Sequence, residues 1–349
     1  MDKKTFNIFP FLSSVIAILL SGSYCLQRYP LALDYGMVVK VLCFSLALIN
    51  LPFCLYLFNK RSDIDFYSFN ISSVIVILSI FILMGFFNFS FLIFPLIIIG
   101  AGSFGLTLFL SFGSKNYMAL LRVILLIFFC SWLSWVVWGG KYLTPFFLEK
   151  IITRSYNSPG GVDTFFHMSM AQMIKTYNFP STGLDELPYI PYHYGSHFIF
   201  AQISKLLNIS VIDIYHFGFP VIFLPLFFHI CFIALHQFKN LNGQTAHFDY
   251  FFWILIFVVF IRFFRIHREG LAFQTTLSCS SLLVSESYLV SMIFFIISLS
   301  ILVVPILKEG DFKLSKVNLF LLIYLMILIG FSKISTLFIL QATIILSYL

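Results

Sequence analysis

Long apolar runs recur along almost the whole chain, and they constrain the fold more than any other feature of the sequence. Of the 349 residues, 60% are hydrophobic and only 10% are Asp, Glu, Lys or Arg. About a quarter of the residues in soluble domains are charged, so this chain cannot build an ordinary water-facing surface. Backbone polar groups inside lipid must be paired within a helix or a closed barrel. The sequence therefore predicts an all-α polytopic integral membrane protein.

About 20 apolar residues are needed to cross the hydrocarbon core as a helix. On this criterion we expect about nine to ten transmembrane helices and one long loop. The last run, 317–349, is too long for one crossing. It is interrupted at Gly330 to Lys333, which predicts two short spans or a span with a re-entrant segment. The other spans are expected near residues 7–27, 36–58, 69–87, 89–112, 117–139, 215–237, 248–264 and 287–307.

These spans divide the chain into three regions. A five-helix membrane region covers 1–139, a long loop covers 140–214, and a second membrane region covers 215–349. The last region stops inside an apolar run, which is consistent with a short or truncated chain.

Lysines and arginines predict the orientation, because short cytoplasmic loops are enriched in them. Over the first five spans only Arg28 and Lys40 lie on the side opposite to the N-terminus. We therefore expect a cytoplasmic N-terminus and an outer location for the loop 140–214. The net charge of +7 fits cytoplasmic loops and anionic lipid. Membrane lipids are thus expected partners, and nucleic acid is not.

The loop 140–214 holds the densest group of side chains capable of chemistry. Apolar residues at helical spacing predict an amphipathic helix over 163–177, after a turn at Pro159-Gly160-Gly161. A second helix is expected over about 194–207, lying on the membrane or dipping into it. The stretch 178–191 between them should be irregular. Walker A, dinucleotide-binding and HExxH motifs are absent, so soluble-type nucleotide and zinc-protease chemistry has no support.

Asp163 has two compatible interpretations. After two glycines, an aspartate suits the N-cap of a helix. Its carboxylate also suits a base that deprotonates or orients an acceptor hydroxyl. His167 lies one helical turn later on the same face, so the pair is able to relay a proton, bind a cation or hydrogen-bond to each other.

His193 and His197 form an HxxxH spacing, which binds zinc when both lie on one helix face. A third ligand would have to be Asp163 or His167, and Gly195 weakens a helix between the two histidines. Substrate binding by neutral imidazoles is therefore the favoured interpretation, and purely structural histidines are the simplest alternative. Further candidates for substrate binding are the acids Asp185 and Glu186 and the tyrosines Tyr192 and Tyr194, with Tyr189 beside them.

Arg262, Arg265 and Arg268 recur at a spacing of three, which places them on one helical stripe at the outer end of a span. Snorkelling to the interface explains one such arginine better than three. Guanidinium groups bind phosphate through paired hydrogen bonds. Lys333 interrupts an apolar run, and a charge at such depth indicates a functional site. We expect the three arginines to suit a phosphate or pyrophosphate head group, with Lys333 as a further functional candidate.

The segment GVDTFFHMSMAQMIKTYNFP followed by PYHYGSHFIFAQIS resembles bacterial members of the GT-C class of membrane glycosyltransferases. The resemblance covers roughly residues 160–205. It implies a sugar donor linked to polyprenyl phosphate or pyrophosphate and a location in the bacterial plasma membrane. It also implies that Asp163 is the catalytic base or helps to bind a divalent cation such as Mg²⁺ or Mn²⁺.

The sequence thus predicts glycosyl transfer to a cell-envelope glycan, glycolipid or protein, with His167 beside Asp163 in the catalytic group. A polysaccharide polymerase would use the same donors. A transporter or lipid flippase would require charged or broken helices near mid-membrane and an internal repeat. A non-catalytic scaffold is the third alternative, in which the loop histidines are incidental.

Overall fold

The computed structural model describes residues 35–58, 66–113, 159–183, 194–223, 286–309 and 315–348, together with Tyr189 and scattered positions at 15–19 and 225–237. Within these ranges some side chains, including those of 159–165, fall outside the description. Almost all of the described residues are helical, and no strand lies among them. The predicted all-α class is confirmed for this part of the chain.

The chain divides into two compact units. The first contains residues 1–64 and 73–229, and the second contains 65–72 and 230–349. The elements of the first unit are α2 (Tyr35–Phe58), α3 (Phe66–Phe86, which begins in the second unit), η1 (Ser90–Leu92), α4 (Ile93–Gly113), α7 (Pro159–Tyr177), α8 (Gly195–Leu207), α9 (Val211–Asp213) and η2 (Ile214–Phe223).

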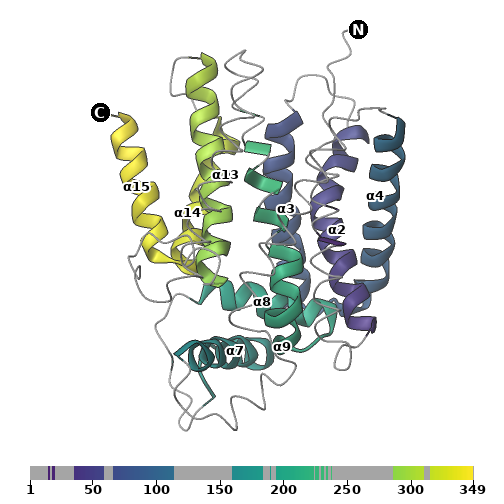
Figure 1. The fold of residues 1–349 in the computed structure, drawn as a ribbon. Coiled ribbons are helices and arrows are strands. Elements are labelled where there is room, and N and C mark those ends of the chain that lie inside the picture. The colour runs from purple at the N-terminus through teal and green to yellow at the C-terminus, as the bar shows by residue number, and fades with distance from the viewer. Residues whose placement is uncertain are drawn as a thin grey trace, which may run out of the picture. The chain divides into compact units, whose positions relative to one another are not determined.

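In the first unit α2 packs against α4 and η2, and α7 packs against α8. The α7 helix lies crosswise to α2 and α4 (Figure 1). The predicted helices near 36–58, 69–87, 89–112 and 194–207 match α2, α3, η1 with α4, and α8. The predicted turn at Pro159 is instead the start of α7. A proline at the first helical position loses no hydrogen bond, because the first N–H groups of a helix have no partner within it.

Two glycines allow neighbouring helices to approach closely. A Cβ atom added to Gly100 of α4 would lie 2.2 Å from the carbonyl oxygen of Cys43 in α2. One added to Gly85 of α3 would lie 2.1 Å from the carbonyl oxygen of Gln202 in α8. Each glycine therefore points a Cα–H at a backbone carbonyl of the helix packed against it, a contact that recurs where helices pack closely. Small residues have this role in membrane helix bundles.

Asparagine residues end three helices of this unit. Asn88, Asn178 and Asn208 follow α3, α7 and α8 with φ of 60°, 55° and 49°. Asparagine is one of the few residues besides glycine that adopts this left-handed conformation readily. After α8 the N–H of Asn208 donates to Lys205 O at 3.2 Å and that of Ile209 to Ser204 O at 3.1 Å. This Schellman pattern satisfies the last carbonyls of α8.

The segment after α8 starts with a capping box and continues as a π-helix. The Ser210 hydroxyl accepts from the N–H of Asp213 at 3.0 Å, and the Asp213 carboxylate accepts from the N–H of Ser210 at 3.2 Å. The π-helix η2 follows at Ile214, and its Val221 carbonyl accepts a hydrogen bond from Ser45 Oγ of α2 at 2.8 Å. This bond fastens η2 to α2, and η2 also contacts α8.

The second unit contains α13 (Glu286–Glu309), α14 (Lys316–Ser332) and α15 (Ile334–Tyr348), which contact one another. Ser315 caps α14 by accepting a hydrogen bond from the N–H of Asn318 at 3.1 Å. The predicted interruption of the last apolar run is confirmed, because α14 ends at Ser332 and Lys333 has extended backbone angles (φ −161°, ψ 106°).

Two described helical stretches, Tyr35–Tyr56 and Phe69–Phe86, are long and apolar enough to cross a membrane, judged by length and composition alone. Shorter apolar helices occupy Ser90–Leu106, Phe217–Cys231, Ser287–Leu302 and Lys316–Ser332. The predicted spans near 7–27, 117–139 and 248–264 lie outside the described residues, apart from positions 15, 18 and 19. Nine to ten crossings therefore stay a prediction.

Candidate functional site

The two helices that carry the conspicuous loop sequences pack directly on each other. Their contact is a small apolar cluster in which Met170 and Ile174 of α7 meet Ala201 of α8, all buried. Phe166, Tyr194 and Phe198 pack around this cluster. The apolar residues of α7 recur every three or four positions, so this face of the helix is the one that α8 covers. The cluster fixes the register in which polar side chains of the two helices meet.

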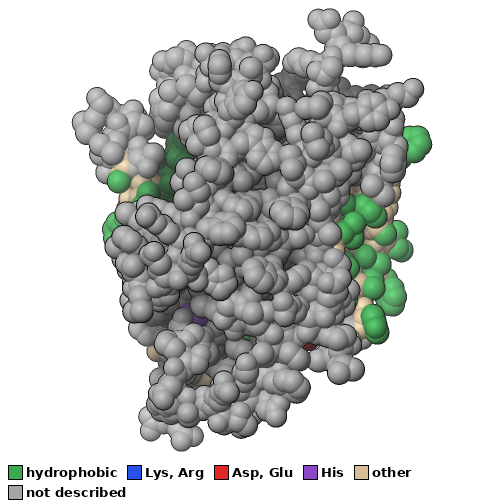
Figure 2. Space-filling view, in the orientation of Figure 1, with side chains coloured by type: hydrophobic (Ala, Val, Ile, Leu, Met, Phe, Trp, Pro, Cys, Tyr) green, Lys and Arg blue, Asp and Glu red, His purple; other side chains and the backbone are tan. Residues whose placement is uncertain are grey.

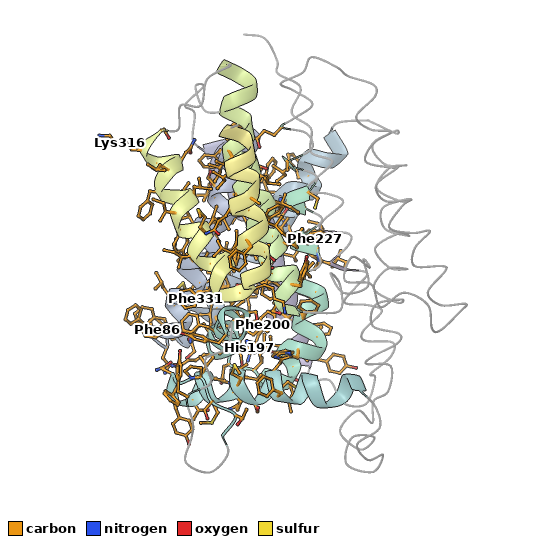
Figure 3. The ribbon with its side chains drawn as sticks, turned by 90° about the vertical axis from the view of Figure 1, so that its left-hand side faces the viewer. Phe86, His197, Phe200, Phe227, Lys316 and Phe331 are labelled. Carbon is orange, nitrogen blue, oxygen red and sulfur yellow. The ribbon has the colours of Figure 1, made fainter. Side chains whose placement is uncertain are left out.

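His167 of α7 and His197 of α8 are hydrogen-bonded inside this interface. The distance from His167 Nδ1 to His197 Nε2 is 2.7 Å, and the rings lie 4.8 Å apart at 40°. His167 is 9% exposed and His197 is 1% exposed. In Figure 3, His197 lies next to α7, with Phe200 on the same helix. Two histidines separated by 30 positions in the sequence therefore form one buried pair.

A hydrogen bond between two imidazole rings holds a single proton between the facing nitrogens. The tautomer decides whether His167 Nδ1 or His197 Nε2 is the donor. If His167 Nδ1 is the donor, the second proton of the pair is on His197 Nδ1; if His197 Nε2 is the donor, it is on His167 Nε2. A change from one tautomer pair to the other therefore moves a proton across both rings. A cation on one ring strengthens the bond, because charge-assisted hydrogen bonds are stronger than neutral ones. Cations on both rings would place two donors face to face. The pair can therefore carry at most one extra proton.

Aromatic residues hold His167 in place. The hydroxyl of Tyr215, in η2, donates to the carbonyl oxygen of His167 at 3.3 Å. The Phe166 ring stands edge-on to the imidazole, with centroids 5.5 Å apart. Tyr215 in turn packs edge-on against Phe200 of α8, at 5.1 Å. The histidine pair is thus fixed by packing from α7, α8 and η2, as a site with a defined geometry requires.

Two lysines donate hydrogen bonds at the C-terminal end of α8. Lys40 of α2 donates to Asn208 O at 3.4 Å, and Lys175 of α7 donates to Ile209 O at 2.7 Å. Ser204 Oγ also donates to Ile209 O, at 2.7 Å. Positive charge at a helix C-terminus is favourable because the helix dipole is negative there. These bonds fasten α8 to both neighbouring helices.

Burial lowers the pKa of Lys175 below its usual value, and the nearby charge of Asp213 opposes part of this change. Lys175 is in the last turn of its own helix, α7, where lysines are common. Only the packing of the helices brings it to the end of α8. Nothing in the sequence spacing distinguishes Lys175 from a solvated lysine.

Tyr194 is the N-cap residue of α8 and was predicted to bind substrate. Burial raises the pKa of its phenol, with a smaller contribution from the hydrogen bond to Tyr189. Tyr189 also contacts the Phe179 ring, with centroids 5.8 Å apart. Tyr189 therefore contacts both Tyr194, at the start of α8, and Phe179, in the segment that leaves α7.

The structure brings His167, His197 and Tyr194 of the predicted site together. Asp163 lies within α7 and not at its N-cap, because the helix begins at Pro159 and its first turn contains no acid. The N-cap interpretation is therefore wrong. The Asp163 side chain is outside the description, so its predicted chemistry stays a prediction. Lys333 belongs to the second unit, where it separates α14 from α15. Seven predicted site residues lie outside the described part of the chain: Asp185, Glu186, Tyr192, His193, Arg262, Arg265 and Arg268.

Among the described residues, no group of three or more His, Cys, Asp and Glu side chains is placed to hold a metal ion. The facing nitrogens of His167 and His197 are at hydrogen-bonding distance. A divalent cation held with Asp163 and His193 stays a prediction. No family model, curated protein or solved structure matches the chain.

Proposed function

We propose that this chain is a polytopic membrane glycosyltransferase. It moves a sugar from a polyprenyl-phosphate or pyrophosphate donor to an acceptor hydroxyl of a cell-envelope glycan, glycolipid or protein, on the outer side of a bacterial plasma membrane. The observation that carries the proposal is the buried His167–His197 hydrogen bond. It joins the two halves of the segment that resembles this class, GVDTFFH and YHYGSH, into a single site.

Exposed apolar side chains support the membrane setting. On α4, Phe94, Ile98 and Phe109 are 73%, 70% and 76% exposed, and on α14 Phe320 is 69% exposed. Hydrophobic side chains gather along the flank formed by α4 (Figure 2). A soluble monomer seldom exposes large contiguous apolar patches, since each apolar side chain in water costs free energy. Lipid tails in contact with these helices remove that cost.

In the proposed reaction the acceptor oxygen attacks the anomeric carbon of the donor sugar. The bond from that carbon to the phosphate oxygen breaks, and the lipid phosphate leaves with the bonding electron pair. Asp163 takes the proton of the acceptor hydroxyl, and His167, one turn later on α7, passes it into the histidine pair. Catalysis of this kind rests on positioning and charge stabilisation. Five polar residues bind the substrates: Asp185, Glu186, Tyr192, His193 and Tyr194. Four basic residues bind the donor phosphate: Arg262, Arg265, Arg268 and Lys333.

A transporter or flippase is the second candidate, and the break between α14 and α15 favours it. Discontinuous helices with polar residues at the break are typical of secondary transporters. Transporters of this kind also contain an internal repeat, and the sequence shows none. The histidine pair in the α7–α8 interface has no specific role in that alternative, so we rank it second.

Topology is tested first, because an α7 helix on the cytoplasmic side of the membrane would exclude an active site on the outer side. In a variant without native cysteines, Gln172→Cys is a suitable probe, since Gln172 is exposed on α7. We expect a membrane-impermeant maleimide to label it in intact cells. A cysteine at Ser62, in the predicted cytoplasmic loop, should react only after the membrane is opened. The reverse pattern would exclude the proposed function.

Transfer is then measured with the purified chain in nanodiscs, using labelled sugars on a panel of polyprenyl-phosphate donors. Asp163→Asn keeps the shape of the side chain but removes the base, and we expect a rate loss of about 100-fold or more. The control Gln172→Ala changes an exposed residue of the same helix and should keep full activity. Full activity in Asp163→Asn would show that Asp163 is not the base. No transfer from any donor by the wild-type chain would contradict the proposal itself.

A further inference from the structure

The lysine side chains that the structure describes in the first unit gather at one place, the C-terminal end of α8. Lys205 is in the last turn of α8 itself. Lys40 of α2 and Lys175 of α7 donate to the carbonyl oxygens of the next two residues, Asn208 at 3.4 Å and Ile209 at 2.7 Å. All three lysine side chains are partly exposed. Three helices thus bring their ammonium groups to one end of α8, and we call these residues the lysine cluster.

The surrounding residues neutralise only part of this positive charge. The dipole of α8 supplies roughly half a unit of negative charge at its C-terminus. Asp213 is the one acidic side chain described in the first unit, and its carboxylate accepts from the N–H and the hydroxyl of Ser210, at 3.2 Å and 2.6 Å. Three ammonium groups therefore outnumber the described negative charges. Burial lowers the pKa of Lys175 even though Asp213 is near, so this ammonium group would gain from a further anion.

The lysine cluster has hydrogen-bond donors that the described residues do not use. An ammonium group has three N–H donors. Within the described part of the chain, Lys40 and Lys175 each use one of them, and Lys205 forms no hydrogen bond or ion pair. Because the three side chains are only partly buried, a group outside the protein can reach them. A phosphate group matches this arrangement, since it combines negative charge with several strong acceptor oxygens.

Exposed apolar side chains lie beside the lysine cluster in the sequence of each neighbouring helix. Val39 of α2, Tyr177 of α7 and Ile212 of α9 are 48%, 67% and 37% exposed, and each is within two positions of a charged residue of this region. Tyrosine and lysine together are typical of the membrane–water interface. The α7 helix lies crosswise to α2 and α4 (Figure 1), as a helix in the plane of the interface does. A phospholipid would contact both the charged and the apolar groups, whereas a free phosphate ion would contact only the charged ones.

We propose that Lys40, Lys175 and Lys205 bind the headgroup of an anionic phospholipid, such as phosphatidylglycerol, whose acyl chains lie against the exposed apolar side chains beside them. The phosphate accepts hydrogen bonds from the ammonium groups and offsets the excess positive charge at the end of α8. The site depends on the membrane setting of the chain and not on sugar transfer. The simplest alternative is that the lysines only cap the C-terminus of α8. Lys205 has no part in that alternative, because it donates to no described carbonyl.

The test uses the full chain in nanodiscs and measures the midpoint of thermal unfolding. In one arm phosphatidylglycerol replaces an increasing fraction of the phosphatidylcholine, and each variant is compared with itself in pure phosphatidylcholine. A ligand that binds only the folded state raises the midpoint as its occupancy increases. We expect a saturating rise, which high ionic strength reduces because salt screens exposed charges. The second arm adds inorganic phosphate to phosphatidylcholine nanodiscs at constant ionic strength, and we expect no comparable rise.

Variants locate the effect. Lys205→Gln is the most informative, because no described hydrogen bond depends on its ammonium group and the fold should be unaffected. It should weaken the apparent affinity for phosphatidylglycerol by about fivefold, the contribution of one lysine near an anionic surface. Lys175→Gln should weaken it similarly. Asp213→Asn keeps an acceptor for the helix cap, removes the opposing charge and should strengthen binding. Lys316→Gln removes one lysine from the start of α14, in the second unit (Figure 3), and should bind as the wild type does.

The proposal is overturned if phosphatidylglycerol does not raise the midpoint of the wild-type chain, or if inorganic phosphate raises it as much, which would make the ligand a soluble anion. It is overturned equally if Lys205→Gln responds as the wild type does, which would leave the lysines as helix caps. A loss in Lys316→Gln as large as that in Lys205→Gln would also overturn it, by indicating general surface charge. Sugar transfer is measured separately. Lipid binding without transfer would refute the enzyme and retain this site, and transfer without lipid binding would do the opposite.

Discussion

His167 Nδ1 lies 2.7 Å from His197 Nε2, and this contact ties α7 to α8 inside a buried apolar interface. A single protein hydrogen bond of this kind contributes about 0.5–1.5 kcal/mol, but removing one partner leaves the other buried and unpaired, at a cost of about 1–3 kcal/mol. The pair should therefore contribute to stability and, in the proposed reaction, to proton transfer, and suitable substitutions separate the two effects.

We expect His167→Ala and His197→Ala each to lower the free energy of unfolding by about 1–3 kcal/mol. The amide of asparagine approximates the Nδ1 position, and that of glutamine approximates Nε2. His167→Asn and His197→Gln should therefore keep most of the stability, because an amide can replace each ring nitrogen in the bond. Neither amide carries a proton between its two ends, so all four variants should lose transfer activity. Unfolding of each variant and sugar transfer by it are measured in parallel. Normal transfer by His197→Gln would restrict the pair to a structural role.

Gly100 and Gly102 in α4 provide a test of the close approach between α2 and α4. A Cβ atom at Gly100 would collide with the Cys43 carbonyl at 2.2 Å, and one at Gly102 would meet nothing within 4 Å. We expect Gly100→Ala to destabilise the protein by about 1–3 kcal/mol, because the backbone cannot move aside easily. Gly102→Ala should be neutral or stabilising by up to about 1 kcal/mol, since alanine is the better helix former. Thermal unfolding in detergent compares the two. Equal effects would mean that α2 and α4 are further apart than described here.

Much of the helical architecture could be predicted from the sequence, because long apolar runs and helix breakers are local signals. The end of α3 near 87, the helix over 194–207 and the break at Lys333 all follow from such signals. The start of α7 was misplaced because Pro159 is compatible both with a turn and with a first helical residue. The three left-handed asparagines at the ends of α3, α7 and α8 show that an asparagine after an apolar run is a further local signal for a helix end.

The site was predictable only in part. Sequence spacing pairs His167 with Asp163, and His197 with His193, because helical periodicity relates residues within one helix. The bond that the structure describes instead joins His167 to His197, across 30 positions. Such a contact depends on how α7 packs against α8, and a single sequence does not contain that information. The role of Lys175 could not be predicted for the same reason, since its partners Ile209 and Asp213 follow α8.

Lys175 should make stability depend on alkaline pH. Burial lowers its pKa in the folded protein below the ordinary 10.5. Between the folded and unfolded pKa values the unfolded chain binds more protons at this residue, so stability rises with pH there. Lys175→Met removes this contribution, and other groups titrate in both proteins. We expect the free energy of unfolding of the wild type, relative to Lys175→Met, to be flat near neutral pH and to increase towards pH 10.5. A decrease would mean that Asp213 stabilises the ammonium more than burial penalises it.

Gln202 is the buried polar residue whose replacement should stabilise the fold. Its side chain is fully buried on α8, and neither atom of its amide has a hydrogen-bond partner among the described residues. Ser204, two positions later, is equally buried, but its hydroxyl donates to Ile209 O at 2.7 Å. The two side chains are therefore equally buried, but only that of Ser204 forms a hydrogen bond with a described residue. Unpaired buried polar groups cost about 1–3 kcal/mol, whereas a paired one contributes about 1 kcal/mol.

We therefore expect Gln202→Met, which keeps the length of the side chain, to raise the free energy of unfolding by about 1–3 kcal/mol. Ser204→Ala should lower it by about 1 kcal/mol, because the Ile209 carbonyl loses one of its two donors. Chemical denaturation of both variants in the same detergent provides the comparison. If Gln202→Met instead destabilises the protein, its amide must bind a group such as an internal water, which typically makes about three hydrogen bonds to buried polar atoms. In that case the interface between α3 and α8, where Gly85 meets the Gln202 backbone, contains a hydrated polar site rather than dry helix packing.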